Sequence, residues 1–195
     1  KFFVFVSPLT ARCGVGYVGL DNYKVGRTVG WLFHNYCRND AAKIGILVGN
    51  HRFRCQDINE SGFRSYFREH ATNLTLLEPQ STFENSNIAR EVTEDLLSKH
   101  PDMAGLFVCG GGITGVIAAL REINRNNDIY LVGFDNAGVT KSALLDNTLN
   151  VMISHPFTRL AQEAIDTMIR ATGTGSDVPA QTINLPFEIV TPENV

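Results

Sequence analysis

The sequence predicts an α/β protein with a doubly wound, mainly parallel sheet, and three observations lead to that prediction. Short apolar runs typical of strands alternate with longer amphipathic runs typical of helices along almost the whole chain. The run Ile44–Val48 is entirely apolar, as expected for a strand that helices cover on both faces. Strands that are joined through helices imply right-handed crossovers and therefore parallel neighbours.

The first part of the chain contains two expected strands, Phe2–Val6 and the shorter Tyr17–Leu20. The polar turn Asp21-Asn22 follows. Its side chains can accept hydrogen bonds from the unpaired amides of a helix start, so we expect a helix over Tyr23–Cys37. After the apolar strand come an expected polar and basic loop, a helix and a strand, over Asn50–Cys55, Gln56–His70 and Leu74–Leu77.

The second part of the chain continues the alternation. A helix over Glu84–Lys99 is expected to stop at His100-Pro101, because the residue before a proline disfavours the helical conformation. The glycines Gly110–Gly112 separate an expected strand from an expected helix. The other elements follow as strand, helix, strand, strand, helix, loop and strand, over Leu106–Cys109, Ile113–Ile123, Ile129–Phe134, Asn150–Ser154, Phe157–Arg170, Thr172–Pro179 and Thr182–Val190.

Composition argues against several classes of function. A net charge of −3 over 195 residues leaves no basic surface for nucleic acid on this chain alone. No apolar run approaches the ~20 residues of a membrane helix, so we expect no membrane partner. The four cysteines include no CxxC pair, which favours free thiols in a reducing compartment. The chain opens inside an apparent strand and without methionine, so we expect a fragment of a longer protein.

Two glycine-rich stretches resemble ligand-binding loops. Gly14-Val-Gly16-Tyr-Val-Gly19 matches GxGxxG but leads into a strand, whereas a dinucleotide site needs these glycines between a strand and a helix. Gly110–Gly112 has that placement, where helix amides favour an anion; a tight turn explains the glycines equally well. The chain has no GxSxG or HExxH motif and no histidines at metal-ligand spacing, so we expect no catalytic nucleophile, metal or cofactor.

Polar side chains at strand ends are the candidate ligand-binding residues, because open α/β sheets bind ligands at the carboxyl ends of their strands. Asp135 ends one strand, where a carboxylate accepts hydrogen bonds from ligand hydroxyls; an Asx turn is the alternative. Arg54 and Gln56 belong to the densest polar cluster after another strand, and Phe53 adds a face on which a sugar ring can stack. A solvated loop is the alternative for this cluster.

Seven short motifs follow one another along nearly the whole chain: Tyr17-Val-Gly-Leu-Asp-Asn-Tyr-Lys-Val-Gly-Arg27, Lys43-Ile-Gly-Ile-Leu-Val-Gly49, Glu60-Ser-Gly-Phe-Arg-Ser-Tyr66, Ala104-Gly-Leu-Phe-Val108, Gly115-Val-Ile-Ala-Ala-Leu120, Leu131-Val-Gly-Phe-Asp135 and Val151-Met-Ile-Ser-His-Pro156. In this order they resemble the effector-binding domain of LacI/GalR-type bacterial transcription regulators, which share their fold with periplasmic sugar-binding proteins. In that family two α/β lobes enclose a small ligand, and the chain crosses between the lobes three times.

The resemblance implies a division of the chain into four parts. Residues 1–16 are expected to be a remnant of the N-terminal lobe and residues 17–150 the C-terminal effector-binding lobe. Residues 151–178 are expected to form a hinge crossing and an N-lobe helix, and residues 179–195 the return strand to the C-terminal lobe. We expect the N-lobe strand and helix to be poorly packed, exchanged between chains or shielded by neighbouring molecules in a crystal, because they lack a sheet of their own.

The resemblance also implies roles for single residues. Asp135 matches the family's acceptor of hydrogen bonds from ligand hydroxyls, and His155 falls in the hinge where sugar-binding relatives often carry glutamine. Asn59 falls where many members carry an arginine that grips the ligand, and Cys109 falls near a position where asparagine is common. Since His155, Asn59 and Cys109 depart from the family pattern, we expect Arg54 and Gln56 to compensate, one helical turn earlier.

The function that the resemblance implies is the cytoplasmic ligand-sensing domain of a LacI-type regulator, which binds a small sugar or polyol between its lobes. It also implies a homodimer, with Ile113–Ile123 and Ala137–Leu145 as interface candidates, and operator DNA bound only through a missing N-terminal headpiece. One alternative is an extracytoplasmic sugar-binding protein of a transporter. Another is an enzyme that acts on a phosphorylated small molecule with Gly110–Gly112 as its anion cradle.

Overall fold

The computed structural model describes residues 2–9, 15–37, 42–70, 73–134, 137–173 and 181–195. The strands are β1 Phe2–Phe5, β2 Val15–Leu20, β3 Lys43–Val48, β4 Thr75–Leu76, β5 Gln80–Ser81, β6 Met103–Val108, β7 Tyr130–Phe134, β8 Val151–Ser154, β9 Thr182–Leu185 and β10 Glu188–Val190. The helices are α1 Asn22–Tyr36, α2 Arg54–His70, α3 Ser86–Lys99, α4 Ile113–Glu122, α5 Ala137–Leu145 and α6 Phe157–Gly173.

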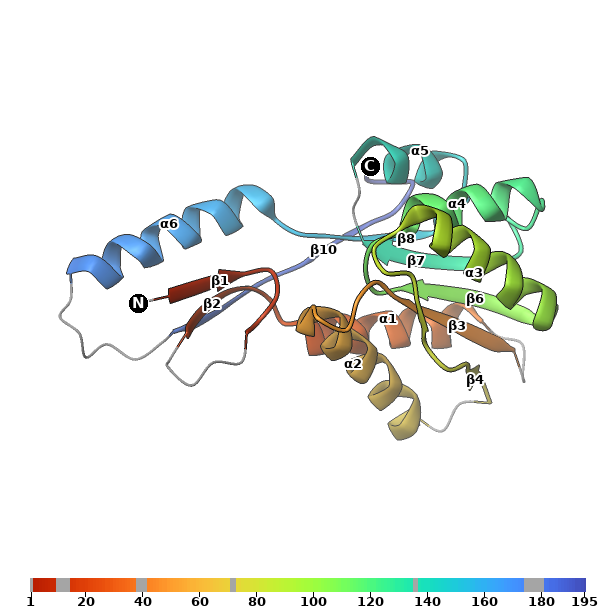
Figure 1. Ribbon diagram of the computed structural model, residues 1–195, viewed down its shortest axis with the longest axis horizontal. Coiled ribbons are helices and arrows are strands. Elements are labelled where there is room, and N and C mark those ends of the chain that lie inside the picture. Colours follow the sequence, from red (N-terminus) through yellow and green to blue (C-terminus); the bar gives the residue numbers. More distant parts are fainter. Residues whose placement is uncertain (1, 10–14, 38–41, 71–72, 135–136, 174–180) are drawn as a thin grey trace.

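Two sheets organise these elements (Figure 1). The larger has seven strands in the order β10-β8-β7-β6-β3-β4, with β5 also paired to β3, and the smaller has the order β1-β2-β9. All their pairings are parallel except that of β10 with β8. With helices on both faces of the larger sheet, this architecture confirms the predicted fold class.

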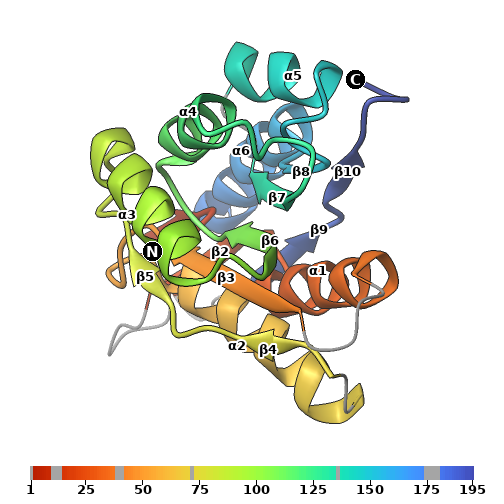
Figure 2. The same cartoon turned by 90° about the vertical axis from the view of Figure 1, so that its right-hand side faces the viewer.

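The larger sheet has an apolar core on each face. On one face Ile44, Ile46 and Phe107 pack with apolar residues of α1 and α2. On the other face Leu47 and Leu106 pack with apolar residues of α3, α4 and α5. In Figure 2 the sheet lies between these two groups of helices. Neighbouring residues of a strand face opposite sides, so the wholly apolar strand β3 contributes to both cores, as its sequence predicts.

The smaller sheet joins segments from both ends of the chain. Strand β2 pairs with β1 on one side and with β9 on the other, and helix α6 lies along this sheet (Figure 1). The expectation that these pieces lack a sheet is therefore wrong, because the C-terminal strand β9 completes one. Strand β2 also belongs to this sheet, although the predicted division grouped Tyr17–Leu20 with residues up to 150.

The single strand predicted over Thr182–Val190 is two strands in different sheets. Strand β9 pairs with β2, whereas β10 runs antiparallel to β8 in the larger sheet. Pro186 and Phe187 separate them, and a proline cannot donate to a strand ladder. Three connections therefore run between the sheets: β2 to α1, β8 to α6 and β9 to β10.

Smaller differences concern element ends. Helix α3 begins at Ser86 rather than Glu84, with Asn85 as its N-cap. Glu84 cannot belong to the helix because its φ of 59° lies outside the right-handed helical region. The two-residue strand β5 has no counterpart in the prediction. The segment Ala137–Leu145, for which no element was predicted, is helix α5. The predicted loop over Thr172–Pro179 lies mostly outside the described residues.

Candidate functional site

The carboxyl ends of β3, β6, β7 and β8 lie along one edge of the larger sheet, at Val48, Val108, Phe134 and Ser154. We call this the strand-end edge. It faces the smaller sheet, and the three connections between the sheets pass beside it (Figure 1). Open α/β sheets bind ligands at this edge, so the side chains there make up the candidate site.

A hydrogen-bonded pair, Gln56 and Glu84, lies at this edge beside the ends of β3 and β6. The backbone N–H of Asn50 donates to Gln56 Oε1 at 2.9 Å, and Gln56 Nε2 donates to Glu84 Oε1 at 2.7 Å. Gln56 is only 6% exposed. The pair therefore links the start of α2 to the segment before α3 and holds a carboxylate at the strand ends.

Glycines at the strand ends make room for this pair. A Cβ atom on Gly49 or Gly111 would overlap the carboxylate of Glu84, and one on Gly110 would lie 2.5 Å from the amide of Gln56. The need for glycine thus comes from side chains that already occupy the space. The predicted backbone cradle at Gly110–Gly112 is instead filled on this side by Gln56 and Glu84.

The turn before α3 is strained in a way that favours a functional site. Phe83 and Glu84 have φ angles of 53° and 59°, which non-glycine residues seldom adopt. Such strain costs of order 1–3 kcal/mol per residue and clusters at ligand sites. Thr82 Oγ1 donates to the carbonyl of Gly111 at 2.8 Å and ties the turn to the β6–α4 loop. The side chain of Phe83 remains 64% exposed.

Two of the predicted site residues lie beside this pair, at the start of α2. Phe53 is 45% exposed, and its backbone N–H donates to the carbonyl of Asn50 at 2.9 Å. Arg54 is the first residue of α2 and is exposed. With Gln56, the start of α2 thus carries an aromatic ring, a cation and an amide, and their contact with a ligand remains a prediction.

Two further predicted residues are buried in the fold. Asn59 is 1% exposed on the side of α2 that packs against α1, and its Oδ1 has no hydrogen-bond partner among the described residues. Cys109 is 3% exposed in the core under α1 and α2, and burial raises the pKa of its thiol well above the ordinary value. A role in ligand contact for either residue remains a prediction.

His155 occupies the connection from β8 to α6. Its ring lies 5.8 Å from the ring of Phe134 and 5.6 Å from that of Phe157, measured between centroids. It also lines a hollow of about 440 Å³ whose other walls include Arg159 and Phe187. The hollow is therefore bounded by two of the three connections between the sheets. Asp135, the foremost predicted ligand residue, lies outside the described residues.

The remaining connection, from β2 to α1, is fixed by Tyr17. Its hydroxyl donates to the carbonyl of Leu20 at 2.8 Å and accepts from Asn22 Nδ2 at 3.1 Å. Burial raises the pKa of this phenol to about 12. A hollow of about 300 Å³ lies beside it, with Ile58 of α2 and Asn184 of β9 among its walls. Hollows thus flank all three connections.

Sequence reasoning missed Phe83 and Glu84, because the pattern after residue 84 reads as a continuous helix. The usable signal was the pair of glycines Gly49 and Gly111 at two adjacent strand ends, which indicates that something approaches the backbone closely. Among the described residues no group of three or more histidine, cysteine, aspartate or glutamate side chains could hold a metal ion. None of the described helices is both long and apolar enough to span a membrane.

Comparison with known proteins gives consistent relatives. The model of a family described as periplasmic binding protein domain matches residues 1–175. A D-apiose import binding protein of Paraburkholderia graminis is 28% identical over 131 residues, which are 67% of this chain and 41% of that protein. A D-ribose/D-allose-binding protein of Pseudomonas aeruginosa is 25% identical over 184 residues, which are 92% of this chain and 56% of that protein. The chain thus spans about half the length of these curated relatives.

Solved structures show the same fold. The glucose-galactose binding protein GanP of Geobacillus stearothermophilus superposes with a TM-score of 0.88 at 21% sequence identity, covering 99% of this chain and 68% of that one.

These findings contradict the expectation of a cytoplasmic LacI-type transcription regulator with a DNA-reading headpiece. The curated relatives are sugar-binding proteins, and one of them serves import. The relatives lend no support to operator DNA or to a homodimer. The resemblance on which the expectation rested was to a fold that regulators and solute-binding proteins share, so the motifs themselves did not separate the two.

Proposed function

The chain belongs to the periplasmic binding protein domain family, and on that premise we propose that it is the sugar-binding part of an extracytoplasmic solute-binding protein for an importer. The sugar would be a free pentose or hexose, held between the strand-end edge and the smaller sheet. On this proposal the protein binds the sugar and releases it without a covalent step.

The observation that carries the proposal is the Gln56–Glu84 pair against the strand-end glycines. A sugar needs several hydrogen-bond acceptors and donors at fixed places, together with apolar faces that match its C–H surfaces. The carboxylate of Glu84 and the amide of Gln56 supply the polar groups. Phe53 and Phe83, which are 45% and 64% exposed, supply apolar faces beside them.

The other predicted residues complete this proposed site. Arg54 would bind a ring or hydroxyl oxygen as a fixed cation, because guanidinium groups stay charged. His155 would contact the sugar from the hinge, and Asp135 would accept hydrogen bonds from its hydroxyls. Asn59 and Cys109 would act from beneath the site, since both are nearly fully buried.

The arrangement of the connections supports binding by closure. Three narrow connections join the two sheets. Among the described residues, hydrogen bonds between β1's loop and α2 join Ser7 and Cys55, where the Cys55 N–H donates to Ser7 Oγ at 3.3 Å and the thiol also bonds the Ser7 side chain. Rotation about the connections would bring the smaller sheet onto a sugar at the strand-end edge, as in hinge closure around ligands.

A panel titration tests the proposed class of ligand. D-Apiose, D-ribose, D-allose, D-glucose and D-galactose would be titrated calorimetrically into the complete protein, with neutral amino acids and inorganic phosphate as other classes. We expect at least one sugar to bind with a Kd in the micromolar range or below, and the other classes to give no heat. Tight binding of an amino acid or phosphate without any sugar binding would overturn the proposal.

A further inference from the structure

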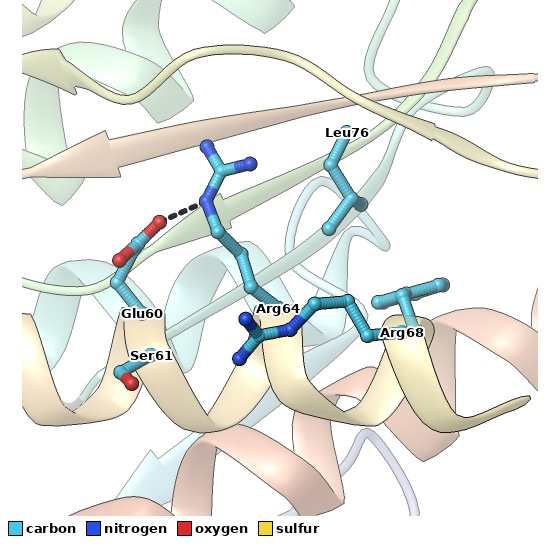
Figure 3. Close-up of a pocket in the computed structure, with 6 residues that line it drawn as sticks. Glu60, Ser61, Arg64, Arg68 and Leu76 are labelled. Carbon is cyan, nitrogen blue, oxygen red and sulfur yellow. Dashed lines mark hydrogen bonds and ion pairs between the residues drawn. The ribbon is translucent and has the colours of Figure 1, made fainter.

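A third hollow lies away from the strand-end edge, between the middle of α2 and the edge strand β4. It has a volume of about 420 Å³ and is lined by Glu60, Ser61, Arg64, Phe67, Arg68 and Leu76. The proposed sugar site does not use it. Figure 3 shows Arg64 rising from α2 toward the strand of Leu76, whereas Arg68 extends back along the helix toward Ser61.

One of its two guanidinium groups is already held in place. Arg64 bonds Glu60 through Nε and donates from one terminal nitrogen to the carbonyl of Leu77 at 3.0 Å. Its side chain is 28% exposed and that of Glu60 is 20% exposed. The terminal nitrogen also lies 3.8 Å from Glu78, whose 88% exposure makes that pair weak. These bonds hold the Arg64 side chain in place at the wall of the hollow, and some of its N–H donors make no bond to a described residue.

The other guanidinium group is uncommitted. Arg68 is exposed and makes no hydrogen bond or ion pair with another described residue. Of the charged groups that line the hollow, two are guanidinium groups and one is a carboxylate, so the lining has a surplus of one positive charge. A planar guanidinium with free donors matches a carboxylate in a two-bond fork.

The remaining lining gives the hollow an apolar side. Phe67 is 7% exposed within the core under α1 and α2, and Leu76 is half-buried against the same core. A fully hydrated anion such as phosphate would leave this surface unused, whereas a carboxylate on an apolar body would cover it.

We propose that this hollow is a binding site for a small monocarboxylate with an apolar body, held by Arg68 and Arg64 over Phe67 and Leu76.

The test uses ¹H–¹⁵N NMR titration of the full chain with 3-phenylpropionate as the probe. We expect saturable shifts centred on Glu60–Arg68 and Leu76, with a Kd in the millimolar range or below. The uncharged 3-phenylpropionamide and inorganic phosphate should each bind at least ten times more weakly. Shift changes that map elsewhere, or equal binding of the amide or of phosphate, would overturn the assignment.

Two variants complete the test. Arg68→Gln should weaken 3-phenylpropionate binding at least tenfold, because it removes the uncommitted guanidinium; since Arg68 is exposed, the fold should be unaffected. Lys141→Gln, which removes one exposed positive charge on α5, should leave the Kd unchanged. If both variants bind the probe as the parent chain does, Arg68 does not hold the carboxylate and the proposal fails.

Discussion

The two sheets of this protein differ in how completely they are covered. Helices lie on both faces of the larger sheet, and its apolar residues form two cores. The smaller sheet has α6 along it, yet this part of the chain exposes Leu9 by 63%, Ile165 by 53% and Ile169 by 63%. Helix α6 buries only Ala164 and Thr167 among its described side chains.

The difference shows where the chain's stability resides. Burial stabilises roughly in proportion to the apolar area removed from water, so side chains of the larger sheet contribute most of the free energy of unfolding. The same type of substitution should therefore lower the free energy of unfolding more in the larger sheet and its helices than in the smaller sheet and α6.

The largest contrast is expected from two helical isoleucines. Ile117 of α4 is 1% exposed and Ile165 of α6 is 53% exposed. Ile117→Ala should lower the free energy of unfolding by about 2–5 kcal/mol through lost burial and a cavity. Ile165→Ala should change it by less than about 0.5 kcal/mol. Urea denaturation followed by circular dichroism measures both, and similar losses in the two variants would contradict the difference between the regions.

A second contrast concerns two glycines. A Cβ atom on Gly26 of α1 would overlap the backbone carbonyl of Asn59 and lie 2.8 Å from the backbone nitrogen of Phe63. On Gly16 of β2 it would meet only the ring of Phe3, a half-buried side chain that can rotate. Gly26→Ala should therefore cost about 1–3 kcal/mol, and Gly16→Ala less than about 1 kcal/mol.

The same urea titrations measure both glycine variants. A cost for Gly16→Ala that equals or exceeds that of Gly26→Ala would show that the smaller sheet is as tightly packed as the contact of α1 with α2.

Thiol reactivity gives a third contrast, between Cys109 in the core of the larger sheet and Cys55 where the two parts of the molecule meet. Burial raises the pKa of Cys37 to about 11, raises that of Cys55, and raises that of Cys109 well above its ordinary value. The thiolate is the reactive form, so each modification rate should rise with pH up to the pKa of that thiol. At pH 8 iodoacetamide should modify Cys109 about a hundredfold more slowly than Cys55, because Cys109 needs the fold to open.

Peptide mass spectrometry of a Cys13→Ser variant resolves the three rates. Modification of Cys109 in the native protein as fast as that of Cys55 would show that the core beneath the strand-end edge is open to solvent.

The smallest effect is expected where the two parts of the molecule meet. Ser7→Ala removes the acceptor for the Cys55 N–H, whose donor–acceptor distance is 3.3 Å. The free energy of unfolding should fall by no more than about 1 kcal/mol. Iodoacetamide should modify Cys55 more slowly at pH 8, because the Ser7 hydroxyl lowers the pKa of this thiol and its loss leaves less thiolate. A faster rate at Cys55 would contradict this expectation and show that the substitution opens the boundary instead.

Fold class and most element positions could be predicted because they depend on local periodicity. The apolar run of β3 and the alternation of strands with helices determine the layers without knowledge of any partner. The two strands β9 and β10 could not be separated from the sequence, because their assignment depends on pairing with β2 and β8, which lie far away in the chain.

The candidate site was predictable only in part, for a similar reason. Phe53, Arg54 and Gln56 were predicted because they come soon after strand β3, which ends at Val48, and a role for them in binding stays a prediction. Glu84 lies at the same edge because Phe83 and Glu84 adopt left-handed conformations and Thr82 fixes the turn. A hydrophobic periodicity does not predict such a turn. Asn59 was predicted from the family resemblance alone, and the structure shows that it lies in the contact of α2 with α1.

The central claim is that the strand-end edge binds the sugar, and substitutions at opposite edges of the larger sheet test it most directly. Calorimetry would compare Gln56→Ala and Glu84→Ala with Asp102→Asn, using the tightest sugar of the panel and the complete protein. Asp102 lies at the amino end of β6, paired with Lys43 at 3.0 Å. We predict at least tenfold weaker binding for the first two variants and an unchanged Kd for the third. Unchanged binding in all three would contradict the account.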